Sequence, residues 1–106
     1  MSRIPYSSLG ALITTAGFRA TVLLRECLAE VERSGTLSGL LGFIEKDHIA
    51  SKIQSVESDL EGLEKHAEVA HIAGYPDLVD EARTHISLIS EGLKGLKQRM
   101  KEVGLA

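Results

Sequence analysis

The sequence contains no tryptophan and no asparagine, and it has one cysteine, two prolines, two tyrosines and two phenylalanines. A single cysteine, Cys27, excludes an internal disulfide and suits a reducing, cytoplasmic location. The ten glycines follow no period, which excludes a collagen-like fibre. Depletion of thermolabile residues such as asparagine is a feature of thermophilic proteins, and we expect a thermophilic source.

The overall composition is that of one ordinary globular domain over residues 1–106. Of these residues 43% are hydrophobic and 25% are charged, and the formal net charge is −3 at pH 7. This length allows one modest hydrophobic core. An acidic balance disfavours a dedicated nucleic-acid-binding protein, because the electrostatic footprint of such proteins is basic.

A long stretch near the N-terminus has almost no charge and is therefore a candidate for a membrane span. Between Ile4 and Leu24 the only charged residue is Arg19, and the length would suit a membrane span. Serine, threonine and glycine interrupt the apolar residues, however, and a cation well inside a span is energetically expensive. Arg3 is followed by Pro5 rather than by a clean apolar run, so we expect no cleaved signal peptide. We predict a buried helix of a soluble protein.

Two loop signals divide the chain. Residues 34–39 read Ser-Gly-Thr-Leu-Ser-Gly, and residues 74–77 read Gly-Tyr-Pro-Asp. Glycine commonly follows the end of a helix, and proline is well tolerated in the first turn of the next helix. We expect three helices, over about residues 6–33, 37–73 and 76–103. Whether residues 36–42 are helix or loop stays open, because two glycines weaken that turn.

The second and third predicted helices carry matching apolar seams, in which apolar residues recur at alternating spacings of four and three. The second helix has Ile49, Ile53, Val56, Leu60, Leu63, Ala67 and Ala70 in its seam, and the third has Val79, Ala82, Ile86, Ile89, Leu93, Leu96, Met100 and Val103. Folding at the Gly-Tyr-Pro-Asp turn brings the two seams into register, with Leu63 opposite Ile86. We therefore predict an all-α, antiparallel up-down-up three-helix bundle whose last two helices form a coiled-coil-like hairpin.

The same register predicts the residues beside the seam. On one side Glu64 lies opposite Arg83 as a candidate salt bridge, and on the other side His66 lies opposite His85. The second side is less charged, so we expect the first helix to pack there, with Gly92 permitting a close approach.

The first predicted helix is apolar over most of its circumference. Its seam comprises Leu9, Ile13, Ala16, Ala20, Leu23 and Cys27, and further apolar residues widen it. A helix with so wide an apolar surface needs more than one neighbour, and two other helices leave part of it exposed. We therefore predict self-association through this helix, as a homodimer or a higher oligomer, with an interface that includes Leu12, Leu24, Leu28 and Val31.

No residue pattern in the sequence is typical of an active site. The chain has no Gly-rich phosphate loop, no Cys-x-x-Cys and no hydrolase nucleophile elbow. Cys27 lies on the apolar seam with no histidine near it in the predicted register, so we expect a buried structural thiol rather than a nucleophile. We predict no catalytic residue, no enzymatic activity and no cofactor.

The histidines are the weak candidates for a metal site. His48 and His71 occur in Glu-x-x-His spacing, as in di-iron helical bundles, but the heptad register places this spacing on outward faces, whereas ligands must point into the core. His66 and His85 lie opposite each other and are the better candidates. Two histidines alone do not complete a tetrahedral zinc site, so we favour hydrogen bonding at a helix junction and no bound metal.

These observations favour a small, non-catalytic protein–protein interaction or assembly module, whose partners are further copies of itself and another protein. An amphipathic groove between the first and third helices would suit a partner helix. One alternative is a bundle that binds a metal or small ligand near His66 and His85. A second alternative is a nucleic-acid-associated factor, although cations near a helix C-terminus also complement the helix dipole; its basic residues would be Lys94, Lys97, Arg99 and Lys101.

Overall fold

The computed structural model describes residues 5–34 and 40–105, including the side chains of all of these except residue 34 and residues 40–45. Three α-helices make up this part of the chain: α1 (Tyr6–Ser34), α2 (Leu40–Ala73) and α3 (Pro76–Glu102). The three helices pack against one another, so the prediction of an all-α protein with three helices is confirmed. The expected first residues of α2, 37–39, lie outside the described residues.

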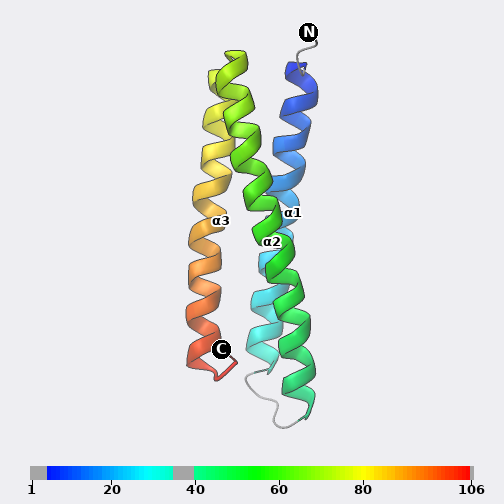
Figure 1. The fold of residues 1–106 in the computed structure, drawn as a ribbon. Coiled ribbons are helices and arrows are strands. Elements are labelled where there is room, and N and C mark those ends of the chain that lie inside the picture. Colours follow the sequence, from blue (N-terminus) through cyan, green and yellow to red (C-terminus); the bar gives the residue numbers. More distant parts are fainter. Residues whose placement is uncertain (1–4, 35–39, 106) are drawn as a thin grey trace.

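The helices lie side by side in an elongated molecule whose Cα atoms span 56 × 20 × 15 Å (Figure 1). Tyr6, at the start of α1, donates a hydrogen bond to Asp77, at the start of α3. Near the opposite end, Arg99 of α3 donates hydrogen bonds to the carboxylate of Glu32 on α1. α1 and α3 therefore run side by side in the same direction.

The turn between α2 and α3 follows the predicted loop signal. Gly74 has a φ of +80°, a left-handed conformation that glycine adopts without steric strain. The N–H of Tyr75 donates to the carbonyl of Ala70 at 2.9 Å, which satisfies one of the last carbonyls of α2. Pro76 then begins α3 in the first turn, where its missing N–H costs no hydrogen bond.

α3, like α2, is followed by a glycine in the left-handed conformation. Gly104 also has a φ of +80°, and the N–H of Leu105 donates to the carbonyl of Met100 at 2.8 Å. This turn folds Leu105 back over the end of the bundle, where its side chain is buried. The C-terminal end of the core is therefore covered by the chain itself.

The predicted seams form the core. Leu60, Ala67, Ile86 and Val103 are partly buried against it, and the other seam residues of α2 and α3 are buried. α1 contributes Leu9, Ile13, Ala16, Ala20, Cys27 and Val31. The seam positions are thus confirmed as core positions, whereas the residue-by-residue coiled-coil register stays a prediction.

α1 packs on the side of α3 that the sequence predicted. A Cβ atom placed on Gly92 would lie 2.9 Å from Cδ1 of Leu24, and one placed on Gly17 would lie 2.5 Å from Nδ1 of His85. Both glycines therefore permit close contact between α1 and α3, as expected for Gly92.

The candidate salt bridge on the other side is not formed. Glu64 and Arg83 line the same shallow hollow between α2 and α3, but the contacts of these two described side chains include no ion pair between them. Long, exposed charged side chains gain little from pairing, because water screens the attraction and fixing both side chains costs entropy.

Candidate functional site

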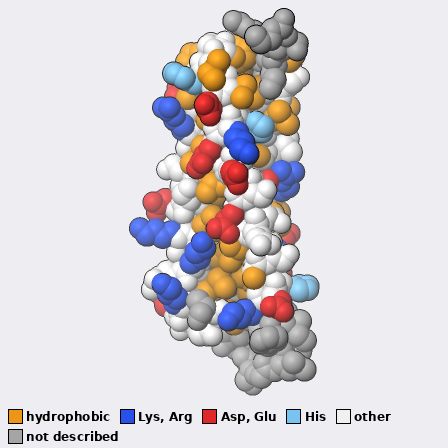
Figure 2. Space-filling model, in the orientation of Figure 1, with side chains coloured by type: hydrophobic (Ala, Val, Ile, Leu, Met, Phe, Trp, Pro, Cys, Tyr) orange, Lys and Arg blue, Asp and Glu red, His pale blue; other side chains and the backbone are white. Residues whose placement is uncertain are grey.

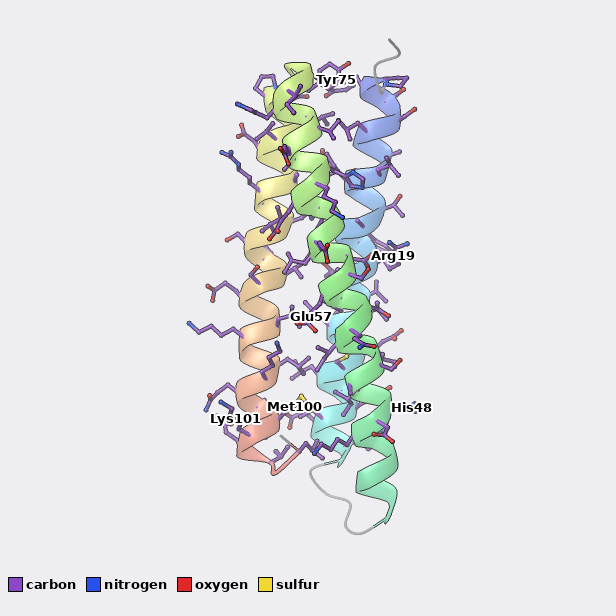
Figure 3. The ribbon with its side chains drawn as sticks, viewed as in Figure 1. Arg19, His48, Glu57, Tyr75, Met100 and Lys101 are labelled. Atoms are coloured by element: carbon purple, nitrogen blue, oxygen red, sulfur yellow. The ribbon has the colours of Figure 1, made fainter. Side chains whose placement is uncertain are left out.

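The N-terminal half of α1 presents an uncharged outward face, which ends at the exposed Arg25. Ala11, Thr15 and Phe18 are exposed on the side of the helix opposite the core, and Val22 continues this row at the same alternating spacing of four and three. Phe18 is 70% exposed. The only charged residue between Pro5 and Leu24, Arg19, lies at the side of α1 that adjoins α2 (Figure 3). We call Ala11, Thr15, Phe18 and Val22 the outward face of α1.

Arg19 is engaged by a carboxylate within the bundle. Its Nε donates to Oδ2 and Oδ1 of Asp59 at 2.9 and 3.1 Å, and this hydrogen bonding raises the pKa of the guanidinium. Asp59 is only 8% exposed and is the buried charged residue of the described chain. A buried carboxylate requires such a partner, so Arg19 is held toward α2 and away from the outward face.

The charges of the C-terminal half of α1 also pair with the other two helices. Lys52 of α2 lies 3.4 Å from a carboxylate oxygen of Glu26 and 2.5 Å from one of Glu30. Glu32 pairs with Arg99 of α3, and this hydrogen bonding lowers the pKa of the Glu32 carboxyl. These ion pairs join α1 to both other helices in the same rotation in which its apolar seam faces the core.

An apolar groove of about 410 Å³ lies between α1 and α3. Three leucines provide its apolar lining, and Leu28 among them is 47% exposed. The α3 wall contains two glycines. Leu24 packs closely on Gly92, whereas a Cβ atom on Gly95 would meet no atom within 4 Å, so the wall is open at Gly95. We call this the α1–α3 groove, and it is lined by Leu24, Arg25, Leu28, Glu32, Gly92, Gly95, Leu96 and Arg99. A groove between these two helices was expected from the sequence.

The four predicted interface residues do not share one surface. Leu12 and Leu28 are 46% and 47% exposed but lie on opposite flanks of α1, and Leu24 is half-buried against Gly92. Val31 is fully buried, because it lies one helical turn after Cys27 and continues the core seam. Val31 therefore belongs to the core, and its assignment to an interface was wrong.

Phe18 was missing from the predicted interface, although it is more exposed than any of the four residues predicted there. The row Ala11, Thr15, Phe18 and Val22 is a second stripe of helical periodicity, on the side opposite the core seam. That signal was available from the sequence. A wide apolar helix contains several such stripes, and periodicity alone does not indicate which of those outside the core seam would face a partner.

The face formed by α2 and α3 is more mixed in character. Figure 2 shows hydrophobic side chains along the middle of this face, with charged side chains among them and on both sides. A hollow of about 600 Å³ lies here between Leu60 and Leu93, and an ion pair spans it from Glu57 to Lys97 at 3.5 Å. Charged side chains around this hollow reduce its value as an apolar contact surface.

The C-terminal basic residues do not form one patch. Lys97 pairs with Glu57 beside α2, whereas Arg99 pairs with Glu32 beside α1. Lys101 points away from the bundle in Figure 3. Because two of these cations are paired with carboxylates on different sides of α3, the segment lacks the concentrated positive charge that phosphate binding uses.

The histidines are distributed without a ligand cluster. His66 and His85 are both partly buried, and the ring of His85 packs on Gly17 with Nε2 3.9 Å from Glu81. His48 is exposed and points away from the bundle in Figure 3. Among the described residues, no group of three or more histidine, cysteine or acidic side chains could hold a metal ion.

Cys27 has the environment of a structural thiol. Its side chain is fully buried, as predicted, and burial raises its pKa to about 11, with the neighbouring Glu30 carboxylate acting in the same direction. At neutral pH almost no reactive thiolate forms, which is the opposite of what a cysteine nucleophile needs.

One helix of the described chain, Tyr6–Arg33, is long and apolar enough for a membrane span by length and composition. The core helix of a soluble protein and an N-terminal signal sequence both have these features, and α1 buries one side in the bundle.

No family of known proteins, no characterised protein and no solved structure is detectably similar to this chain.

Proposed function

We propose that this protein is a small, non-catalytic assembly module that associates with further copies of itself through the outward face of α1. The observation that supports this proposal is the exposure of Phe18 within a row that carries no charge. Exposed apolar surface of this kind commonly marks an interaction site, because its removal from water is favourable.

The proposed architecture explains why α1 would be the associating helix. In an up-down-up bundle with a coiled-coil-like hairpin, α2 and α3 satisfy each other's apolar seams. α1 then packs its core seam on that hairpin and keeps a second apolar side for another molecule. A cytoplasmic location is part of the same proposal, since the buried thiol of Cys27 needs no oxidising compartment.

Analytical ultracentrifugation of the untagged protein tests the proposal directly. We expect a dimer or higher oligomer at micromolar concentrations. Thr15→Glu should shift the equilibrium to monomer, because it would bury a charge in the contact. Thr84→Glu is the matched control, since Thr84 is exposed on the outer side of α3. A wild-type protein that stays monomeric throughout would contradict self-association.

Native mass spectrometry of the same sample separates assembly from ligand binding. We expect multiples of the chain mass with nothing added. A retained metal or small molecule would instead favour the alternative function, and replacement of His66 and His85 would then be the next experiment.

A further inference from the structure

We propose that two copies associate with their α1 helices antiparallel, and that Phe18 of each copy inserts into the α1–α3 groove of the other. This inference rests on the proposed self-association and specifies its geometry and its contact residues. A second copy is the occupant because one molecule carries both an exposed aromatic side chain and an apolar groove.

Phe18 is the projecting group. It is 70% exposed on the outward face of α1, and its neighbours along that face are the small or uncharged side chains of Ala11, Thr15 and Val22. Short side chains allow another helix to approach closely. Buried aromatic anchors of this type often contribute most of the affinity of an interface.

The α1–α3 groove is the receiving site. Its volume is about 410 Å³, and its apolar lining comes from Leu24, Leu28 and Leu96. Gly95 leaves its wall open, and no atom of its own chain within 4 Å requires a glycine there. A side chain of a second chain therefore has room to enter the groove at Gly95.

The positions along α1 determine the direction of the pairing. The groove spans the level of Leu24 to Glu32, which is C-terminal to Phe18. A parallel pair would place Phe18 at the level of the other Phe18 and away from the groove. An antiparallel pair with its two-fold axis near Val22 brings each Phe18 to the level of Leu24 to Leu28 of the second copy, beside the groove, and the contact occurs twice by symmetry.

The charges of α3 favour the same direction. Its first turns carry Asp77, Asp80 and Glu81 before Arg83, and its last turns carry Lys97, Arg99 and Lys101 before Glu102. Lys97 and Arg99 are paired within the chain, whereas Lys101 points away from the bundle. α3 runs beside α1 in the same direction, so an antiparallel pair brings Lys101 of each copy to the level of the acidic first turns of the other α3. A parallel pair would bring like charges together, which disfavours association.

Two variants and their mixture test this geometry. Phe18→Ala removes the projecting side chain, and Gly95→Leu fills the groove where the structure has open space. Each variant alone should weaken dimerisation by about 100-fold, since both copies of the contact are lost at about tenfold or more each. An equimolar mixture should recover part of the association, because Phe18 of the Gly95→Leu chain still fits the intact groove of the Phe18→Ala chain.

Leu88→Ala and Gly62→Leu are the matched controls. Leu88 is 66% exposed on α3, and a Cβ on Gly62 meets nothing within 4 Å, so neither change should affect the dimer. Circular dichroism should show that every variant remains helical.

The outcomes separate this inference from the proposal on which it rests. A wild-type protein that is monomeric overturns both and leaves the groove to a different protein. A wild-type dimer that is unaffected by Phe18→Ala or Gly95→Leu overturns the groove contact and leaves self-association standing. Weakening by each variant without recovery in the mixture overturns the reciprocal arrangement.

Discussion

Alanine at Gly17 should destabilise the protein, whereas alanine at Gly62 should stabilise it. Both glycines are inside helices, but their surroundings differ. A Cβ on Gly17 would lie 2.5, 2.6 and 2.7 Å from three atoms of the His85 ring, closer than real Cβ contacts allow. A Cβ on Gly62 would meet no atom within 4 Å.

The magnitudes follow from two opposing effects. Alanine is better than glycine inside a helix by about 1 kcal/mol, and Gly62→Ala should gain most of this. Forcing an extra methyl group into a packed contact costs about 1–3 kcal/mol, because the imidazole of His85 must move. Gly17→Ala should therefore lose about 1 kcal/mol net, which separates the two variants by about 2 kcal/mol.

Urea denaturation followed by circular dichroism measures this difference. The two variants and the wild type are compared at one protein concentration, since association adds to apparent stability. In a thermal scan, a difference of 2 kcal/mol corresponds to about 8 °C for a chain of this size. Gly92→Ala should fall between the two, because the atom it approaches is the flexible end of Leu24.

Repeating Gly17→Ala in a His85→Ala background tests whether the contact with the imidazole ring causes the loss of stability. Without the imidazole ring the added methyl group has room, so Gly17→Ala should become neutral or stabilising in this background. Gly17→Ala that is as stable as Gly62→Ala in the otherwise wild-type chain would show that α1 and α3 do not approach as closely as described.

Two further predictions concern buried groups. Arg19→Met should lower the free energy of unfolding by about 2 kcal/mol, because it leaves the buried Asp59 carboxylate unpaired, and adding Asp59→Leu should restore most of the loss in urea titrations. If Arg19→Met alone has wild-type stability, the ion pair has no structural role. Cys27 should react with a thiol reagent at pH 8 only on unfolding. Because burial raises its pKa from 9.0 to about 11, the unfolded chain releases the proton first, so the stability of the wild type relative to Cys27→Ala should fall by about 2 kcal/mol as pH rises from 9 to 11. Constant relative stability over that range would refute the burial argument.

The sequence was sufficient for the helices and for the core positions of α2 and α3. In both seams apolar residues recur at alternating spacings of four and three without a gap. Seam residues such as Leu63 and Val79 are buried in the structure. The boundaries could be predicted because glycine and proline act locally. Gly74 ends α2 with a positive φ, and Pro76 begins α3.

The core seam of α1 could be predicted in the same way, since Leu9, Ile13 and the rest of that seam are buried or partly buried. The remaining surface of α1 was harder to interpret, because its apolar residues also occupy other stripes of the helix. The ion pairs from Arg19 to Asp59 and from Lys52 to Glu30 join residues far apart in the sequence, and no local pattern predicts them. Phe18 was therefore overlooked, and Val31 was assigned to an interface although it continues the core seam.

Glycine placement connects the fold to the proposed contact. Gly17 and Gly92 lie where α1 meets α3, and a Cβ at each would come within 2.9 Å or less of a side chain on the opposite helix. These two glycines therefore have a packing reason within the chain, whereas a Cβ at Gly10 would make an ordinary contact with Leu78 at 3.5 Å. Gly95 shares the face of α3 with Gly92 but has no such neighbour, and neither does Gly62. A glycine without neighbours is therefore not informative by itself. Gly95 differs from Gly62 because it forms part of the wall of an apolar groove beside a half-exposed leucine. A side chain from a second molecule would fill the space that the glycine leaves in this wall.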